Sequence, residues 1–84
     1  MNDVMVNIGS GNYLPKSSFL MVLIPDSQPV KTLISQYRDE NRLIDATRNR
    51  KTQSVIMFDG KSGPYIVLSV FTPRTISNRF DDAV

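Results

Sequence analysis

Apolar residues recur in five short segments that have the length and spacing of β-strands. In the segment 4–8, Val4, Val6 and Ile8 occupy alternate positions, which is the pattern of a strand with one buried face. The run 19–24 is apolar at every position and ends at Pro25, which predicts a central strand that is covered on both faces. Further strands are predicted at 43–47, 54–58 and 65–71.

An amphipathic helix is predicted over about 28–41. Asp26 or Ser27 can accept hydrogen bonds from the first free backbone N–H groups, and Pro29 suits the first helical turn. The residues that follow place apolar side chains on one stripe of a helix, at Val30, Leu33, Ile34 and Tyr37.

A second, shorter helix is predicted at the C-terminus. Thr72 and Pro73 repeat the start signal of a helix, and Ile76 and Phe80 follow one turn apart. The segment 81–84 is expected to be a disordered tail.

The resulting order, β-β-α-β-β-β-α, predicts an α+β fold for a single domain over 1–84, with a small mixed sheet of about five strands. One amphipathic helix packs on this sheet and the short C-terminal helix lies at its edge. A single helix cannot cover both faces of a sheet, and the strands are apolar on both. Either the sheet is partly exposed or a second copy of the chain covers its other face. We favour the second copy, so that the protein is a homo-oligomer.

The composition excludes several kinds of chemistry. The 84 residues contain no histidine and no cysteine, so Ser-His and Cys-His pairs, an imidazole base and thiolate metal ligands are all absent. We predict a protein that is not an enzyme, with no cofactor, no metal site and no small-molecule substrate. No apolar run is long enough to cross a membrane and the N-terminus does not resemble a signal peptide, so a cytoplasmic location is expected.

The most prominent candidate site is a group of three cations, Arg48, Arg50 and Lys51, at the tip of a predicted hairpin between the strands 43–47 and 54–58. A protruding loop lets such side chains reach phosphate oxygens, and Asn49 suits a left-handed turn position. The net charge of only +2 does not itself argue for nucleic acid, and solvated turns often carry arginine and lysine. The loop therefore has two interpretations, a nucleic-acid contact and an ordinary solvated turn.

Two glycine-containing segments are weaker signals. Gly9 and Gly11 form a GxG pair, but no third glycine and no helix follow, so a tight turn is predicted. The Gly60-Lys61-Ser62 triplet is not a phosphate-binding loop, because Val55 stands where that motif requires its first glycine.

Asp45 lies in a largely apolar stretch and needs a partner there. We expect an arginine to pair with it, across a subunit interface or within the chain.

Several motifs together resemble one family of small bacterial proteins. They are Asn7-Ile8-Gly9-x-Gly11-Asn12, Pro25-Asp26-Ser27-x-Pro29-Val30-Lys31, Leu43-Ile44-Asp45-Ala46-Thr47-x-x-Arg50-Lys51-Thr52, Ile66-Val67-Leu68-Ser69 and Pro73-x-Thr75-Ile76. Over about 6–80 this pattern is similar to the RemA family, regulators of extracellular-matrix (biofilm) genes. The resemblance implies a fold like LytTR domains, double-stranded DNA as a partner without a cofactor, and ring-like oligomers that present a basic surface to the duplex.

The resemblance also assigns residues. Arg50 and Lys51 match the basic pair of the family. The family often has a basic residue where this chain has Ser18, Thr32 and Gln53, and Lys16 is expected to substitute in part.

Two hypotheses follow for the function. The first is an oligomeric, sequence-tolerant DNA-binding transcriptional regulator that uses Arg48, Arg50 and Lys51, with Lys16 in support. The second is an oligomeric protein-interaction module that has lost DNA binding together with the missing cations. RNA binding ranks below both, since no aromatic platform is visible.

Overall fold

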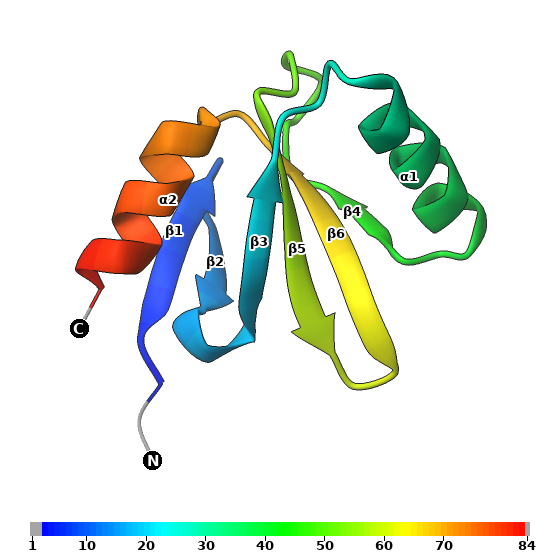
Figure 1. The fold of residues 1–84 in the computed structure, drawn as a ribbon. Helices are drawn as coiled ribbons and strands as arrows, with labels where there is room; N and C mark the ends of the chain where they lie inside the picture. The colour runs from blue at the N-terminus through cyan, green and yellow to red at the C-terminus, as the bar shows by residue number, and fades with distance from the viewer. Residues whose placement is uncertain (1–2, 84) are drawn as a thin grey trace.

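The computed structural model describes residues 3–83, which fold into two sheets and two helices (Figure 1). The α+β class predicted from the sequence is confirmed, but with six strands in two sheets instead of about five in one. The elements in order are β1 (Met5–Gly9), β2 (Asn12–Pro15), a 3₁₀ turn η1 (Lys16–Ser18), β3 (Phe19–Leu23), α1 (Gln28–Asp39), β4 (Leu43–Asp45), β5 (Ser54–Gly60), β6 (Gly63–Ser69) and α2 (Pro73–Asp82).

Strands β1 and β2 form a separate antiparallel hairpin that the sequence analysis missed in part. Strand β2 has only four residues, and two of them are Asn12 and Pro15, which are uncommon inside strands. The tight turn expected at Gly9 and Gly11 is confirmed, since both glycines and Ser10 between them have positive φ. Because glycine adopts positive φ without a steric penalty, the turn is short enough for Val6 to pair with Leu14.

The four-stranded sheet has the order β3-β5-β6-β4 and is mixed, as expected. Strand β5 pairs antiparallel with β3 on one side and with β6 on the other, while β4 pairs parallel with β6. The expected hairpin between 43–47 and 54–58 is therefore wrong. The short turn at Lys61 and Ser62 places β6 directly beside β5, so β4 has to pair on the far side of β6 and the segment 46–53 crosses over the end of β6.

Strand β3 is an edge strand, and the prediction of a central strand in the run 19–24 is wrong. Its apolar run reflects contacts on both faces, but only β5 pairs with its backbone. Leu20 and Met21 remain half exposed, and the pairing register shifts between Phe19 and Met21. A uniformly apolar strand at a sheet edge is unusual, because such an edge favours pairing with another chain.

Helix α1 packs on one face of the four-stranded sheet. On this face Val55, Ile66 and Leu68 are buried, and Val30 and Ile34 of the predicted stripe lie half-buried against them. The stripe is thus confirmed, although no residue of α1 is fully buried.

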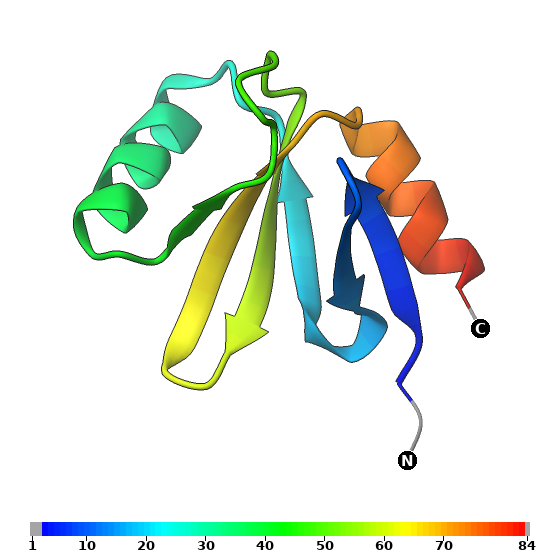
Figure 2. The ribbon, with the colours of Figure 1, turned by 180° about the vertical axis from the view of Figure 1, so that it is seen from behind.

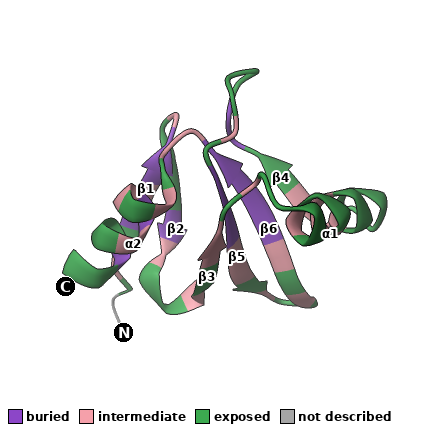
Figure 3. Ribbon diagram, turned by 45° about the horizontal axis from the view of Figure 1, so that its top comes forward, coloured by how far each residue is buried: buried purple, intermediate pink, exposed green. Residues whose placement is uncertain are grey.

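The opposite face is covered by the β1–β2 hairpin and by α2, within the same chain (Figure 3). The expectation that a second copy covers this face is therefore wrong. Ile76 and Phe80 of α2 anchor this side of the core at 0% and 2% exposure, and the Phe80 ring stacks on Phe19 with 4.1 Å between centroids. Six large apolar residues among those described still remain about half exposed: Met5, Tyr13, Leu20, Met21, Ile24 and Ile44.

Both helices begin as the capping signals predict. The Ser27 hydroxyl accepts from the backbone N–H of Val30, and the Thr72 hydroxyl accepts from that of Thr75. Helix α2 extends through Asp82 into the segment where we expected a disordered tail, and Val84 lies outside the described residues. No helix within 3–83 is both long enough and apolar enough to cross a membrane.

Truncation of the α2 anchor tests this description of the core. Phe80→Ala is expected to lower the free energy of unfolding by about 3–5 kcal/mol, because it removes a buried ring and leaves a cavity against Phe19. Asp81→Ala, one position further along the exposed face of α2, is expected to change it by less than about 0.5 kcal/mol. Urea unfolding at a fixed protein concentration measures both, and equal losses would contradict the assigned core.

Candidate nucleic-acid interface

The sheet topology brings three segments that are distant in the sequence to one end of the molecule. Strands β3 and β6 both run antiparallel to β5, so they are parallel to each other and end on the same side. Each is followed closely by a helix, and the segment 46–53 enters β5 from that same side. Figures 1 and 2 show the 46–53 loop beside the starts of both helices. We call the segments 24–31, 46–53 and 70–75 the cationic end.

Half of the positive side chains of the protein lie at the cationic end. The loop supplies Arg48, Arg50 and Lys51, while Lys31 and Arg74 lie in the first turns of α1 and α2. All five are exposed, and they are five of the ten lysines and arginines of the chain. Of the eight acidic residues, only Asp26 lies in the cationic end, and Asp45 lies directly beside it. The modest net charge therefore conceals a clear separation of charge along the molecule.

Backbone hydrogen bonds hold the 46–53 loop at both ends. The N–H of Ala46 donates to the carbonyl of Leu68, and the N–H of Gln53 donates to the carbonyl of Ser69. Since the loop is bonded to β6 at both ends, its exposed central part projects from a fixed base.

The tip of the loop is a tight turn with left-handed backbone. The N–H of Arg50 donates to the carbonyl of Thr47 at 3.1 Å, and both central residues have positive φ, 54° at Arg48 and 67° at Asn49. The left-handed position expected at Asn49 is confirmed, and Arg48 is a second one. Positive φ at two successive residues is the feature of type I′ turns, in which asparagine is well tolerated and arginine is uncommon.

The Asp45 carboxylate supports this turn. Its Oδ1 accepts from the backbone N–H of Thr47 at 2.9 Å and from the Thr47 hydroxyl at 2.5 Å. These two hydrogen bonds lower the pKa of Asp45 below 3.8, burial opposes the shift, and the positive charge of Arg38 adds to it. The partner of Asp45 inside the chain is thus a threonine, which corrects the arginine expected within the chain. Within 3–83 only Arg42 and Glu40 approach within ion-pair distance, at 3.7 Å.

Two helix N-termini add to the positive potential of this end. The start of a helix carries a partial positive charge, which favours anions. Here Pro29 and Pro73 have no N–H, and the N–H groups of Val30 and Thr75 donate to their capping hydroxyls, so the helix dipole contributes more than free N–H donors do. The starts of α1 and α2 lie on either side of a shallow cavity of about 260 Å³. Its lining comes from all three segments and consists of Ile24, Pro25, Asp26, Lys51, Thr52, Gln53 and Pro73. The lining includes one cation, Lys51, and one carboxylate, Asp26, so the exposed cations around the cavity suit contacts with phosphate groups better than the cavity itself does.

The structure does not bring Lys16 to the cationic end. Phe19 at the start of β3 pairs with Phe58, whereas Leu23 at its end pairs with Val55, so η1 and the 46–53 loop lie at opposite ends of these strands. The Lys16 ammonium donates to the carbonyl of Ala83 at 2.5 Å, beyond the end of α2. Ser18 lies in the same turn, at the same distal end.

Sequence reasoning missed Lys31 and Arg74 as members of the site. A signal for them was present, since each follows a capping residue and a proline at the start of a helix. Lys31 and Arg74 come together because β3 and β6 are parallel to each other. A hairpin at 46–53 would not predict this parallel arrangement. The Gly60–Gly63 segment is a hairpin turn between β5 and β6, and no helix follows it, which agrees with the rejection of a phosphate-binding loop at this position.

The described residues include no group of three or more acidic side chains arranged to hold a metal ion. The fold and the cationic end define a small α+β protein whose clustered side chains suit the binding of an anionic surface. The family model described as "RemA-like: Extracellular matrix regulatory protein A-like" matches residues 5–80. The chain therefore belongs to the RemA-like family, and the resemblance predicted from the sequence is confirmed.

Relatives in several bacteria support this assignment. The chain is 40% identical over 80 residues to a protein of Trichormus variabilis, covering 95% of this chain and 88% of the relative. It is 44% identical over 75 residues to a protein of Thermosynechococcus vestitus, covering 89% and 94%. It is 38% identical over 79 residues to a protein of Halalkalibacterium halodurans, covering 94% and 87%. Each is named as a putative regulatory protein, so the chain is a member of a family of regulatory proteins.

The Asp45 hydrogen bonds can be tested by titration. In the wild type the pKa of Asp45 is expected to lie below 3.8, and in Thr47→Val it is expected to move up toward that value because the hydroxyl donor is removed. A lowered pKa contributes stability that is present above 3.8 and is lost as the pH falls through the lower folded value. Carboxyl-carbon NMR measures the pKa, and Thr47→Ser, which keeps a hydroxyl, is the control. Equal pKa values in the valine and serine variants would contradict the assignment.

Proposed function

We propose that the protein is an oligomeric, sequence-tolerant regulator that binds double-stranded DNA through the cationic end. The observation that supports this most strongly is the convergence of five exposed cations and two helix N-termini on one end of a chain with a net charge of only +2. Contacts of this kind neutralise phosphates and position a protein on the duplex. The family assignment supports a regulatory role.

The chemistry of the cationic end favours reading of the DNA backbone over reading of bases. Arginine guanidinium groups bind phosphate oxygens bidentately, and the positive ends of the two helix dipoles attract the same anions. Base-specific recognition usually inserts a helix or a strand pair into the major groove, whereas here the helices point their starts at the ligand. A sequence-tolerant contact follows, with shape contributing to specificity.

Oligomerisation is the second part of the proposal. Five cations on one copy give weak binding at physiological salt, but several copies on one duplex add their contacts through avidity. The six half-exposed apolar residues provide surface for association between copies. A ring is the closed form of such an assembly, and the family description favours extracellular-matrix genes as the targets of a regulator that acts in the cytoplasm.

Removal of two loop cations tests the DNA contact. Arg50→Ala with Lys51→Ala is expected to weaken DNA binding strongly and to leave the oligomer intact, because both side chains are exposed. The slope of log K against log salt concentration should fall by about 0.9 for each phosphate that the variant no longer neutralises. Fluorescence anisotropy with a generic duplex at several salt concentrations measures affinity and slope together.

A matched pair of substitutions controls for net charge. Lys16→Ala with Lys61→Ala also removes two positive charges, both from the distal end, and is expected to leave most of the affinity in place. Lys16→Ala, whose ammonium is bonded to Ala83, is expected to weaken binding less than Arg50→Ala alone. If the distal pair weakens binding as much as the loop pair, the cationic end is not the contact. Binding that is absent or insensitive to salt would favour a protein-interaction module instead.

The mass in solution tests the assembly. Light scattering is expected to give a multiple of the 9.5 kDa chain, both in the free protein and in the complex with DNA. A mass of one chain at all concentrations would contradict the oligomer, whatever the DNA affinity.

A further inference from the structure

Strand β1 has an unpaired edge that faces an open groove. The N–H of Lys16 donates to the carbonyl of Val4, so in the antiparallel ladder Val4 and Val6 direct their backbone groups toward β2. Met5 and Asn7 therefore direct their N–H and C=O groups away from β2, toward α2. This edge offers two donors and two acceptors to a further strand.

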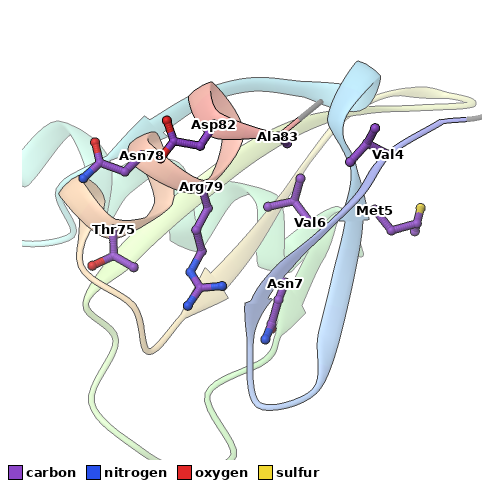
Figure 4. A pocket seen from close by; sticks show the side chains of 9 residues that line it. All are labelled: Val4, Met5, Val6, Asn7, Thr75, Asn78, Arg79, Asp82 and Ala83. Carbon is purple, nitrogen blue, oxygen red and sulfur yellow. The ribbon is translucent and has the colours of Figure 1, made fainter.

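The groove between β1 and α2 has a volume of about 530 Å³ (Figure 4). Thr75, Asn78, Arg79 and Asp82 line it from one face of the helix, and β1 forms the other wall. The apolar side chain of Met5, 52% exposed, stands at this edge. The groove thus combines a free strand edge with polar and apolar contacts for side chains.

Arg79 is the cation of this groove. Its guanidinium carbon lies 4.6 Å from the centroid of the Phe71 ring, a cation–π contact that favours this direction of the side chain. Figure 4 shows it pointing from α2 toward β1. Asp82 also lines the groove, but no carboxylate of the described residues lies within ion-pair distance of Arg79.

Strand β4 has a second unpaired edge, with the opposite charge. The N–H of Ile66 donates to the carbonyl of Arg42, and the N–H of Ala46 donates to the carbonyl of Leu68. Along β4, every second residue therefore directs its backbone N–H and C=O groups toward β6, and the residues between them direct theirs away. Leu43 and Asp45 therefore direct their backbone groups away from β6, again with two donors and two acceptors.

The side chains on the β4 edge are also available. Ile44 is 51% exposed, and Asp45 is exposed. Thr47 occupies only Oδ1 of the Asp45 carboxylate, and Arg38 acts on it from outside ion-pair distance. A cation from outside the chain can therefore approach the other oxygen.

We propose that the β4 edge of one copy pairs with the β1 edge of the next copy, with Asp45 of the first facing Arg79 of the second. The two edges match in the number of backbone donors and acceptors, in charge and in exposed apolar side chains. They lie on opposite sides of the molecule, β1 beside α2 and β4 beside α1 (Figures 1 and 2). The inference rests on the oligomer of the proposed function and specifies its contact.

A contact between two different surfaces is head-to-tail, so each copy keeps one free edge of each kind until the assembly closes. Such contacts produce rings when the rotation closes and filaments when it does not. The cations of the cationic end take no part in this contact, since neither edge nor the lining of the groove includes Lys31, Arg74 or the exposed tip of the loop at 48–51. Assembly therefore leaves the DNA contact open on every copy.

Charge reversal tests the contact. Arg79→Glu and Asp45→Arg are each expected to weaken the association at least tenfold and to lower the mass measured by light scattering, because each places like charges together. Arg79→Lys keeps the charge and should keep the assembly. Lys61→Glu and Asp59→Arg make the same changes of charge on the β5–β6 hairpin and should also keep it.

Recombination of the two reversals gives the decisive result. In an equimolar mixture of Arg79→Glu and Asp45→Arg proteins, every contact between unlike copies again joins opposite charges, so the mass should return. The double variant should assemble by itself for the same reason. Circular dichroism of each variant confirms that the domain is folded before the masses are compared.

The outcomes separate this contact from the proposed function. If the single reversals keep the mass of the wild type, or if the mixture and the double variant stay dissociated, the Asp45–Arg79 contact is wrong while the oligomer stands. If the wild type itself is a single chain at all concentrations, the oligomer fails and the contact fails with it. DNA binding is measured independently by the loop variants.

Discussion

The direction of strand β5 determines where everything else in this protein lies. Both of its neighbours run antiparallel to it, so both end on the side where β5 begins. The helices that follow β3 and β6 must start on that side, and the chain must return there from β4 to enter β5. A single antiparallel arrangement thus gathers two helix starts and one crossing loop without any direct contact among their charged side chains. The cationic end is a result of topology as much as of composition.

The local elements were largely predictable from the sequence, because capping residues and apolar spacing act over a few positions. The starts of α1 and α2, the stripe of α1 and the left-handed position at Asn49 are examples. The pairing of strands was not predictable in the same way. Segments 43–47 and 54–58 have the pattern of a hairpin, yet the short turn at Lys61 and Ser62 placed β6 beside β5. Long-range pairing is decided by competition among strands, and a local pattern does not record that competition.

The same difference explains the candidate site. Arg48, Arg50 and Lys51 stand out in the sequence because they are adjacent. Lys31 and Arg74 are 43 positions apart and are brought to one end only by the parallel relation of β3 and β6. The core shows the same difference. Strand β2 has no clear pattern in the sequence, so the sequence predicts that a second copy covers the apolar residues on this face, whereas β1, β2 and α2 of the same chain cover them.

The backbone at Arg48 has a consequence for how the protein tolerates change. An L-residue with a side chain at φ 54° is less stable there than glycine by about 1 kcal/mol, before the greater flexibility of glycine in the unfolded chain is counted. Since these two effects are of similar size and opposite sign, arginine at the loop tip adds little to the stability of the domain. Replacement by glycine would give a domain of about the same resistance to heat, with one cation fewer. Stability therefore does not account for arginine at this position, whereas a contact made by its charge would.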